Sequence, residues 1–311
     1  MRVSLSAIDQ WTGTPLHTTH AIPLSRGRTL RLGPTPTVMG ILNVTPDSFS
    51  DGGQHDRLVT AVAHAHAMIA EGADIIDIGG ESTRPGATPV STQEELDRVI
   101  PVIEALIAAG VTTPISIDSY KPLVADQAIQ SGATIINDVH GLQGAPEMAD
   151  IAALHGVPVI VMHWDKARDT SLPIADEVRR YFDASIAIAE RAGIDRASLI
   201  LDPGFGFAKS LADNYALLRD LNKLRSKPVH EPSEPVHQHG QTPLLIGTSR
   251  KSMIGKLLGN EASERLAGTI ATNVLGYARG GHIFRVHDIL PNRDALRVAQ
   301  ATLYGPPNDA R

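Results

Sequence analysis

The sequence predicts an α/β fold, a single-domain (β/α)8 TIM barrel, and two observations carry that prediction. Eight short apolar runs recur along the chain, rich in Ile and Val and without polar alternation, as is typical of parallel strands covered on both faces. An amphipathic stretch with helical periodicity follows each run. The expected strands are Thr37–Leu42, Asp74–Ile78, Pro114–Ile117, Ala133–Ile136, Val157–Met162, Ser198–Leu201, Pro243–Gly247 and Gly281–Val286.

The expected helices alternate with these strands, and several of them end at a glycine. Gly72, Gly110, Gly132, Gly156 and Gly193 each stand between an amphipathic stretch and the next apolar run, which is typical of a helix C-cap. Eight strand–helix units in series favour a closed barrel. The expected helices are Asp56–Glu71, Thr92–Ala109, Lys121–Gln130, Pro146–His155, Ile174–Ala192, Leu211–Arg225, Ala262–Arg279 and Pro291–Leu303.

An open, doubly wound parallel sheet is the structural alternative. Its usual phosphate-binding signal is missing, because Gly204-Phe-Gly206-Phe-Ala-Lys does not complete G-x-G-x-x-G and no Walker A sequence occurs. A barrel makes a more specific statement, because its chemistry belongs at the carboxyl ends of the strands.

Composition excludes several classes of protein. The chain has 311 residues, a net charge of −6 and no cysteine, so disulfides, thiolate metal sites and cysteine nucleophiles are ruled out. The absence of cysteine fits a reducing compartment, and we expect a cytoplasmic protein. The negative charge and the 4% aromatic content argue against nucleic acid or a membrane as partner. No apolar run reaches the ~18 residues of a transmembrane helix.

Two segments fall outside the barrel pattern. Residues 1–36 are an N-terminal extension, in which we expect a hairpin that closes the bottom of the barrel formed by residues 37–305. Residues 226–242, rich in Pro, His and Glu, are an insertion between a helix and the next strand. A barrel places that insertion on the face opposite the active site.

Two loops on the active-site face are unusually long. Asn43–His55 and Gly79–Ser91 combine Gly, Pro and charged residues, as lids over a phosphate pocket do. Phe49 lies at the tip of the first loop, where we expect contact with an aromatic substrate.

Polar and ionisable side chains stand at the end of every expected strand. The carboxyl ends of the strands of a barrel meet at one rim, so these side chains predict a ligand site there. They are Asn43, Glu81-Ser82-Thr83-Arg84, Asp118, Asn137-Asp138, His163, Asp202, Ser249-Arg250-Lys251, Arg285 and His287.

Four of these residues indicate a flat heterocycle. Asp118, Asn137, Asp202 and Lys251 supply hydrogen-bond acceptors, an amide and a cationic donor. A ring edge with an amino group and an N–H beside a carbonyl would match them, because a carboxylate accepts both N–H groups and Lys donates to the carbonyl. Guanine and pterins both carry that edge.

A second set suits phosphate oxygens. Asn43, Arg84, Arg285 and His287 form a basic, donor-rich group. Asn43 is also a candidate ligand for Mg²⁺, which takes few protein oxygens when phosphate and water supply the others. The rim is therefore expected to hold a fused-ring pocket beside a diphosphate pocket.

Each candidate has a structural alternative. Asp118 or Asp202 alone could cap the helix that follows it, and Asp138 is better explained as a cap or loop residue. Lys251 could be a Schiff-base lysine, although its neighbours are polar. His163 is either a rim ligand or a buried histidine.

The histidine pairs do not indicate a metal site. His64 and His66 stand two apart on an expected helix and cannot share a ligand, so we expect them at the surface. His237 and His239 lie in the insertion without carboxylate support. The H-x-H of a metal-dependent hydrolase would stand after the first strand, where this chain has Asn43-Val-Thr.

Six motifs follow one another along residues 37–300. They are Met39-Gly-Ile-Leu-Asn-Val-Thr-Pro-Asp-Ser-Phe-Ser-Asp-Gly-Gly53, Asp77-Ile-Gly-Gly-Glu-Ser-Thr-Arg-Pro-Gly86, Ile135-Ile-Asn-Asp138, Leu201-Asp-Pro-Gly-Phe-Gly206, Ser249-Arg-Lys-Ser-Met-Ile-Gly255 and Arg285-Val-His287. In this order they resemble the motifs of the dihydropteroate synthases of folate biosynthesis.

The resemblance implies a role for each of these groups. It assigns the pterin to Asp118, Asn137, Asp202 and Lys251, the diphosphate to Arg285, His287, Asn43 and Arg84, and Mg²⁺ to Asn43. It places Phe49, Thr83 and Pro85 near p-aminobenzoate. The catalytic residues would be Asp51, Arg84 and Lys251.

The reaction implied is a transfer of the alkyl or aryl type. It joins 6-hydroxymethyl-7,8-dihydropterin diphosphate to p-aminobenzoate and releases 7,8-dihydropteroate and diphosphate. The resemblance also implies a homodimer and a sulfonamide target.

Three departures from the family pattern leave the expected site complete. The third strand reads Ser-Ile-Asp-Ser, His163-Trp164 replaces a His-Met pair, and residues 226–242 are inserted. Two rival functions stay open, a pterin-binding barrel serving methyl transfer to a corrinoid partner and a non-catalytic pterin binder. The strand-8 phosphate group argues against the first, and both complete loops argue against the second.

Overall fold

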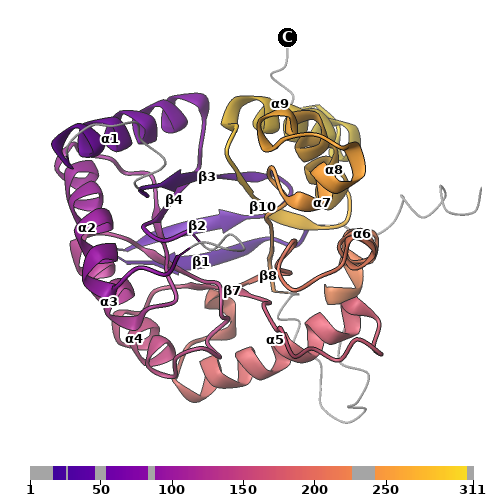
Figure 1. Cartoon of the computed structure of the whole chain (residues 1–311), viewed down its shortest axis with the longest axis horizontal. Coiled ribbons are helices and arrows are strands. Elements are labelled where there is room, and N and C mark those ends of the chain that lie inside the picture. The colour runs from indigo at the N-terminus through magenta and orange to yellow at the C-terminus, as the bar shows by residue number, and fades with distance from the viewer. Residues whose placement is uncertain (1–16, 26, 46–53, 83–87, 226–241, 307–311) are drawn as a thin grey trace, which may run out of the picture.

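A closed barrel of eight parallel strands occupies the centre of the computed structural model, which describes residues 17–25, 27–45, 54–82, 88–225 and 242–306 (Figure 1). Consecutive strands are neighbours, and the last strand pairs with the first, so the predicted (β/α)8 barrel is confirmed. The strands are β3 (Thr37–Asn43), β4 (Ile75–Gly79), β5 (Ile115–Asp118), β6 (Ile135–Asp138), β7 (Val159–Met162), β8 (Leu199–Asp202), β9 (Leu244–Ile246) and β10 (Gly281–Val286).

The helices surround the barrel and begin and end where local chemistry favours it. Ser91 caps α2 by accepting from the backbone N–H of Glu94, and Ser210 and Asp213 form a capping box at the start of α6. The helices are α1 (Gln54–Glu71), α2 (Thr92–Ala108), α3 (Pro122–Ser131), α4 (Glu147–His155), α5 (Ile174–Arg191), α6 (Leu211–Arg219), α7 (Ser252–Leu258), α8 (Leu266–Tyr277) and α9 (Ile289–Tyr304), with 3-10 turns η4 (Arg196–Ser198), η5 (Leu221–Arg225) and η6 (Ala262–Glu264).

The helix predictions were wrong in three places. Helix α7 was not predicted, because it has seven residues and carries Gly255, a poor helix former, at its centre. A Cβ at that position would lie 2.2 Å from a guanidinium nitrogen of Arg265 and would displace that side chain. The helix expected over 262–279 divides into η6 and α8, and the one expected over 211–225 divides into α6 and η5.

Alternate residues of each strand face the helices or the barrel interior. Val38, Ile76, Ile117, Val159 and Ile246 face outward and belong to the large apolar core between barrel and helices. This two-sided burial explains why the strands are apolar without alternation over most of their length.

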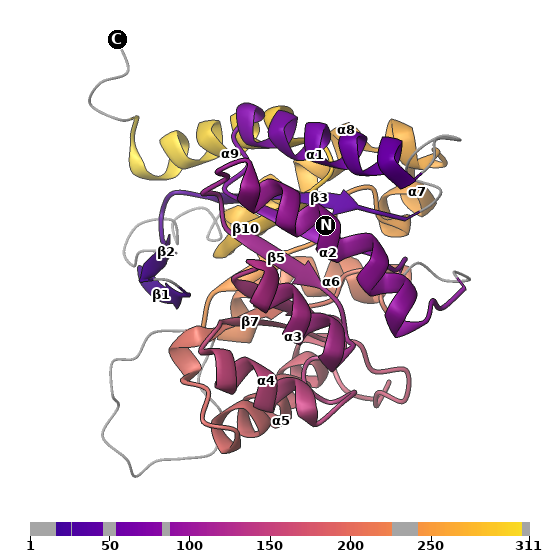
Figure 2. The ribbon, with the colours of Figure 1, turned by 90° about the vertical axis from the view of Figure 1, so that its left-hand side faces the viewer.

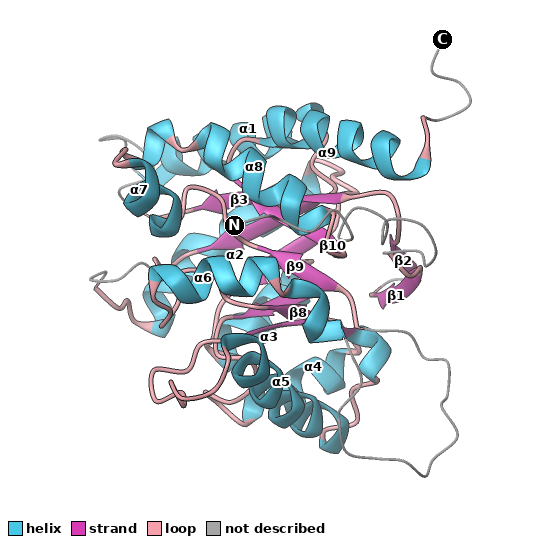
Figure 3. Cartoon of the chain, turned by 90° about the vertical axis from the view of Figure 1, so that its right-hand side faces the viewer, coloured by secondary structure: helices cyan, strands magenta, loops and turns pink. Residues whose placement is uncertain are grey.

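The inward-facing residues near the strand starts form a second apolar cluster. Strand β1 (His20–Leu24) and strand β2 (Arg28–Leu32) pair as an antiparallel hairpin, which lies at one end of the barrel while α7 lies at the other (Figure 2). Figure 3 shows the same arrangement from the opposite side. The hairpin side chains Ile22, Leu24, Leu30 and Leu32 are buried with the barrel residues Met39, Ile75, Ile135, Ile160, Ile200, Leu245 and Ile283.

In the described part of the chain, the hairpin therefore closes the lower end of the barrel and leaves the upper end, at the carboxyl ends of the strands, for a ligand. His64 and His66 are exposed on α1, as predicted. Among the described residues, no helix is both long and apolar enough to cross a membrane.

Candidate active site

A pocket that is partly open to solvent lies at the carboxyl ends of the barrel strands. Five predicted site residues line it, namely Asp118, Asn137, Asp202, Lys251 and Arg285. Four of them are in strands and face the barrel interior. Asn137, Asp202 and Arg285 each stand two positions after a residue of the second apolar cluster. Asp118 is the last residue of β5. Asp202 follows Ile200, for example, and Arg285 follows Ile283. Because every second residue of a strand faces the barrel interior, the next inward-facing residue after the apolar cluster is already polar.

Asp77 contacts one pterin candidate and one phosphate candidate of the pocket lining. It is fully buried on β4 and accepts from Arg285 Nε at 2.6 Å and from Asn137 Nδ2 at 3.2 Å. Arg285 Nη2 also donates to Asp118 Oδ2 at 2.6 Å. Asp77 belongs to one of the six sequence motifs, which predict no role for it. The available signal was a carboxylate inside an otherwise apolar strand.

Three acceptors in the pocket are available to a ligand. Asp118 Oδ1 is buried and has no hydrogen-bond partner among the residues described. Because Asn137 gives its N–H to Asp77, its carbonyl oxygen is the atom left for a ligand. Asp202 accepts from the backbone N–H of Gly204 through Oδ1, and its Oδ2 lies beside Gly247, where no side chain fills the space.

Lys251 brings a cation to the opposite wall. Its Nζ lies 4.0 Å from the centroid of the Phe207 ring, which also lines the pocket. An ammonium over an aromatic face is attracted by the ring quadrupole, so Phe207 helps to place the donor. Carboxylates, an amide oxygen and one ammonium group lining one pocket are what the predicted heterocycle edge requires.

Burial dominates the electrostatics of the carboxylates. It raises the pKa of Asp118 to about 7, while the charge of Arg285 opposes the shift. Burial also raises the pKa of Asp202, opposed first by the Gly204 N–H and then by Lys251. For Arg285 burial acts to lower the pKa, but Asp77 and Asp118 outweigh it and raise the pKa. Arg285 therefore stays charged and favours the ionised forms of Asp118 and Asp202.

Asn43 lies on the same level of the barrel as the pterin candidates. It pairs in register with Gly79, which pairs with Asp118, and Asp118 pairs with Asn137. Its half-buried amide is one neutral oxygen, and no group of three His, Cys, Asp or Glu side chains in the described chain could hold a metal. Such a donor fits Mg²⁺ only where phosphate and water supply the other ligands.

His287 lies beside the loop that carries Lys251 and is not among the pocket-lining residues. Its Nδ1 is 3.0 Å from Ser249 Oγ, and its backbone N–H donates to the same hydroxyl. This contact ties the end of β10 to the start of the β9–α7 loop.

Several predicted site residues lie outside the described part of the chain. They are Phe49 and Asp51 in the first long loop and Thr83, Arg84 and Pro85 in the second. Their predicted roles stay predictions.

The structural alternatives are resolved differently for each residue. Asp138 is a loop-stabilising residue, since its carboxylate accepts from the backbone N–H groups of His140 and Leu142. Asp202 holds a turn, while Asp118 accepts a hydrogen bond from Arg285 rather than from a helix start. His163 is fully buried, so it is not a rim ligand.

The chain matches the family model "Pterin binding enzyme" over residues 39–287. It is 50% identical to the dihydropteroate synthase of Escherichia coli (strain K12), over 88% of this chain and 94% of that protein. The chain belongs to the dihydropteroate synthase family.

Solved structures of the family agree with the fold. The Xanthomonas albilineans dihydropteroate synthase with 4-aminobenzoic acid has a TM-score of 0.82 and 45% identity, covering 93% of this chain and 100% of that chain. The Yersinia pestis dihydropteroate synthase in a sulfonamide drug complex has a TM-score of 0.78 and 43% identity, covering 92% and 98%. Membership in the dihydropteroate synthase family confirms the prediction of an enzyme, a transferase of folate biosynthesis.

Proposed function

We propose that this chain joins 6-hydroxymethyl-7,8-dihydropterin diphosphate to p-aminobenzoate, giving 7,8-dihydropteroate and diphosphate. One observation of the pocket supports this substrate most directly. Asp118 Oδ1, an acceptor buried without a partner in the described residues, lies in a pocket with Asp202 and Lys251. A buried acceptor costs about 1–3 kcal/mol when unpaired, so the pocket favours a ligand that brings N–H donors.

The pterin ring is the group we assign to the three acceptors. Its amino group and ring N–H would donate to Asp202 and Asp118, and a further N–H to the Asn137 amide oxygen. Lys251 would donate to the ring carbonyl. Asp77 takes no ligand bond in this scheme but orients Asn137 and Arg285.

The diphosphate is assigned to the basic side of the site. Arg285 and His287, with Arg84 from the second long loop, would bind its oxygens. Asn43 would hold Mg²⁺ through its amide oxygen. Bound there with the diphosphate, Mg²⁺ would neutralise charge on the leaving group.

The chemistry follows from the substrates. The C–O bond between the pterin methylene and diphosphate breaks, and its electron pair leaves with the diphosphate. The electron-rich dihydropterin stabilises the cationic methylene, and Asp51 would add a negative charge near it. The p-aminobenzoate nitrogen then forms the C–N bond and loses a proton. No strong base is required, because the amine proton becomes acidic once the bond has formed.

The second substrate is assigned to Phe49, Thr83 and Pro85. Because sulfonamides mimic p-aminobenzoate, we expect them to compete with it at this chain as well. We also propose a cytoplasmic homodimer, on the cysteine-free sequence and the family resemblance. Sedimentation of the purified chain tests the dimer.

Product formation tests the proposal. The protein is incubated with pterin diphosphate, p-aminobenzoate and Mg²⁺, and dihydropteroate and diphosphate are followed by chromatography. We expect both in equal amounts, lost on addition of EDTA. Binding of pterin diphosphate without product would indicate a binding paralogue, and no binding would overturn the pterin assignment.

A second measurement tests the order of bond changes. Slow release of diphosphate without p-aminobenzoate, with the hydroxymethyl pterin as product, supports early C–O cleavage. Strictly second-order behaviour without that leakage counts against it.

A further inference from the structure

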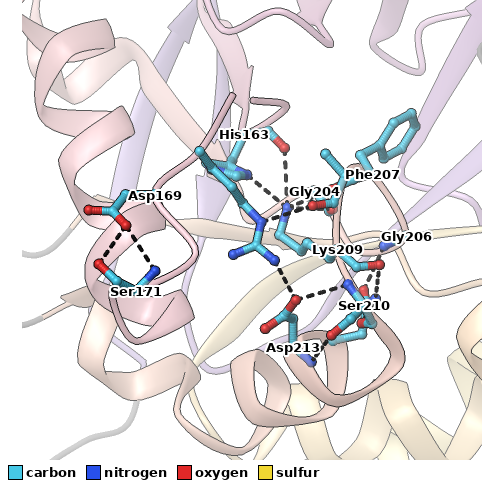
Figure 4. A network of polar contacts seen from close by, with 12 residues as sticks. His163, Asp169, Ser171, Gly204, Gly206, Phe207, Lys209, Ser210 and Asp213 are labelled. Atoms are coloured by element: carbon cyan, nitrogen blue, oxygen red, sulfur yellow. Dashed lines mark hydrogen bonds and ion pairs between the residues drawn. The ribbon is translucent and has the colours of Figure 1, made fainter. Parts of the chain in front are cut away.

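Lys209 is a half-buried cation beside the Gly204–Phe207 turn, which follows Asp202 in the chain (Figure 4). Its Nζ lies 2.7 Å from His163 Nδ1, 2.9 Å from the Gly204 carbonyl oxygen and 3.1 Å from the Phe207 carbonyl oxygen. The His163 carbonyl oxygen lies farther away, at 3.5 Å, so the three ammonium protons have three nearer neutral acceptors. Lys209 therefore links the end of β7 to both ends of the Gly204–Phe207 turn.

The turn connects Lys209 to the pterin pocket through one residue. The Gly204 N–H donates to Asp202 Oδ1 at 2.8 Å, while the Gly204 carbonyl accepts from Lys209. The same turn supplies Phe207, over which the Lys251 ammonium lies. Two of the proposed pterin ligands, Asp202 and Lys251, thus contact a turn that Lys209 holds from the other side.

The conformation of the turn depends on contacts with its surroundings. A Cβ on Gly204 would lie 2.0 Å from the carbonyl oxygen of His163, so the backbone passes in close contact with the end of β7. Gly204, Gly206 and Ala208 all have positive φ, at 67°, 83° and 49°. Positive φ is costly for Ala, so external contacts must maintain the conformation.

Arg168 provides a second contact to the same loop, farther from the pocket. Its Nε donates to the Ala208 carbonyl at 3.0 Å and its Nη2 to Asp213 at 2.5 Å, at the start of α6. Arg168 therefore anchors the loop to its helix, whereas Lys209 holds the part that contacts Asp202.

We propose that Lys209 is a positioning residue for pterin recognition, acting through the Gly204–Phe207 turn on Asp202 and Lys251. The inference rests on the proposed function, and neither the sequence motifs nor the proposed chemistry uses this residue.

Charge supports the same role. Burial lowers the pKa of Lys209 to about 7, and the charge of Asp202 is the largest opposing influence. In return Lys209 is one of the cations that lower the pKa of Asp202 against the effect of burial. Burial and then Lys209 lower the pKa of His163 to about 3, so His163 stays neutral and accepts at Nδ1.

The test compares neutral variants at this position with matched controls. Lys209→Met removes the charge and every hydrogen bond of the ammonium group, and Lys209→Gln removes the charge but keeps an N–H donor. For Lys209→Met we expect the KM for pterin diphosphate to rise at least about tenfold, with kcat and the KM for p-aminobenzoate changed less than about threefold. For Lys209→Gln we expect a smaller rise. Lys256→Met, an exposed lysine on α7, should leave all three constants unchanged.

Two further measurements separate positioning from general stability. Arg168→Met should lower the melting temperature while raising the pterin KM less than Lys209→Met does. In Lys209→Ala, n-propylammonium, which matches the deleted atoms, should lower the pterin KM, and 1-propanol should not.

The outcomes are distinct. Wild-type protein without product overturns the proposed function. Active wild type with a Lys209→Met variant whose pterin KM stays within about twofold overturns the role of Lys209. Loss of folded structure in both Lys209→Met and Lys209→Gln, judged by circular dichroism, overturns it in favour of a folding role.

Discussion

The two ends of the barrel are built from the same strands but have different roles, one in stability and the other in ligand binding. At the lower end, inward residues such as Ile160 and Ile200 meet the hairpin residue Ile22 in a dry apolar layer. At the upper end, Asp202 and Arg285 stand two residues farther along their strands and face a pocket. Burial of apolar surface at the lower end stabilises the fold. Burial of charged groups at the upper end destabilises it but provides groups that can bind a ligand.

This division predicts which property each substitution changes. Substitutions at the lower end should reduce stability and leave pterin binding intact. Substitutions at the upper end should reduce binding, and should reduce stability only where they leave a buried charge unpaired. The predictions below test that separation.

Removal of Asp202 is the strongest test on the binding side. Asp202→Ala leaves the ring N–H groups unpaired, at about 1–3 kcal/mol for each lost partner, so we expect pterin binding to fall at least about 100-fold. Stability should change little, since an acid whose pKa is raised by burial costs energy to keep ionised. Calorimetric titration with pterin diphosphate checks this, and unchanged affinity would refute the pterin assignment.

Arg285 lies at the upper end, but its substitution should reduce stability as well as binding. Arg285→Met leaves Asp77 and Asp118 buried without their cation, and we expect a loss of about 3–5 kcal/mol in the free energy of unfolding. The loss should be smaller at acid pH, where Asp118 is protonated. Urea unfolding measures it.

A surface ion pair provides the control for this substitution. Arg250→Met breaks the partly exposed pair with Asp288 and should cost at most about 1 kcal/mol. Equal losses in the two variants would show that the buried cluster contributes no more than a surface pair.

The hairpin tests the lower end. Ile22 is fully buried in the apolar layer, so Ile22→Ala should cost about 2–5 kcal/mol of stability. The KM for pterin diphosphate should stay unchanged, because the layer separates Ile22 from the pocket. A raised KM with unchanged stability would mean that the hairpin acts on the site rather than on the fold.

Most of the barrel and of its rim could be predicted from sequence, because both depend on short-range periodicity. The apolar runs locate the strands, and the residues that close them, such as Asp118 and Asn137, locate the pocket. Helix α7 was missed because a glycine at its centre weakens the local signal.

The supporting residues were missed for a different reason. Asp77 acts through Arg285, 208 positions away, and Lys209 is held by His163, 46 positions away, directly after β7. No local spacing connects such partners, so only the closed barrel brings them together. Sequence periodicity therefore predicts where a ligand binds but not what holds its ligands in place.

The pH dependence of Asp118 makes the two properties of the upper end change in opposite directions. Burial raises the pKa of Asp118 from 3.8 to about 7, so the folded state binds more protons than the unfolded state between these values. The associated stability is present below pH 3.8 and is lost as the pH rises through about 7. Pterin binding needs the ionised carboxylate, so the affinity for 6-hydroxymethyl-7,8-dihydropterin, which carries no diphosphate, should fall about tenfold from pH 8 to 6. Asp118→Asn should bind weakly and lose most of this slope, whereas a flat wild-type profile would show that Arg285 keeps Asp118 ionised throughout.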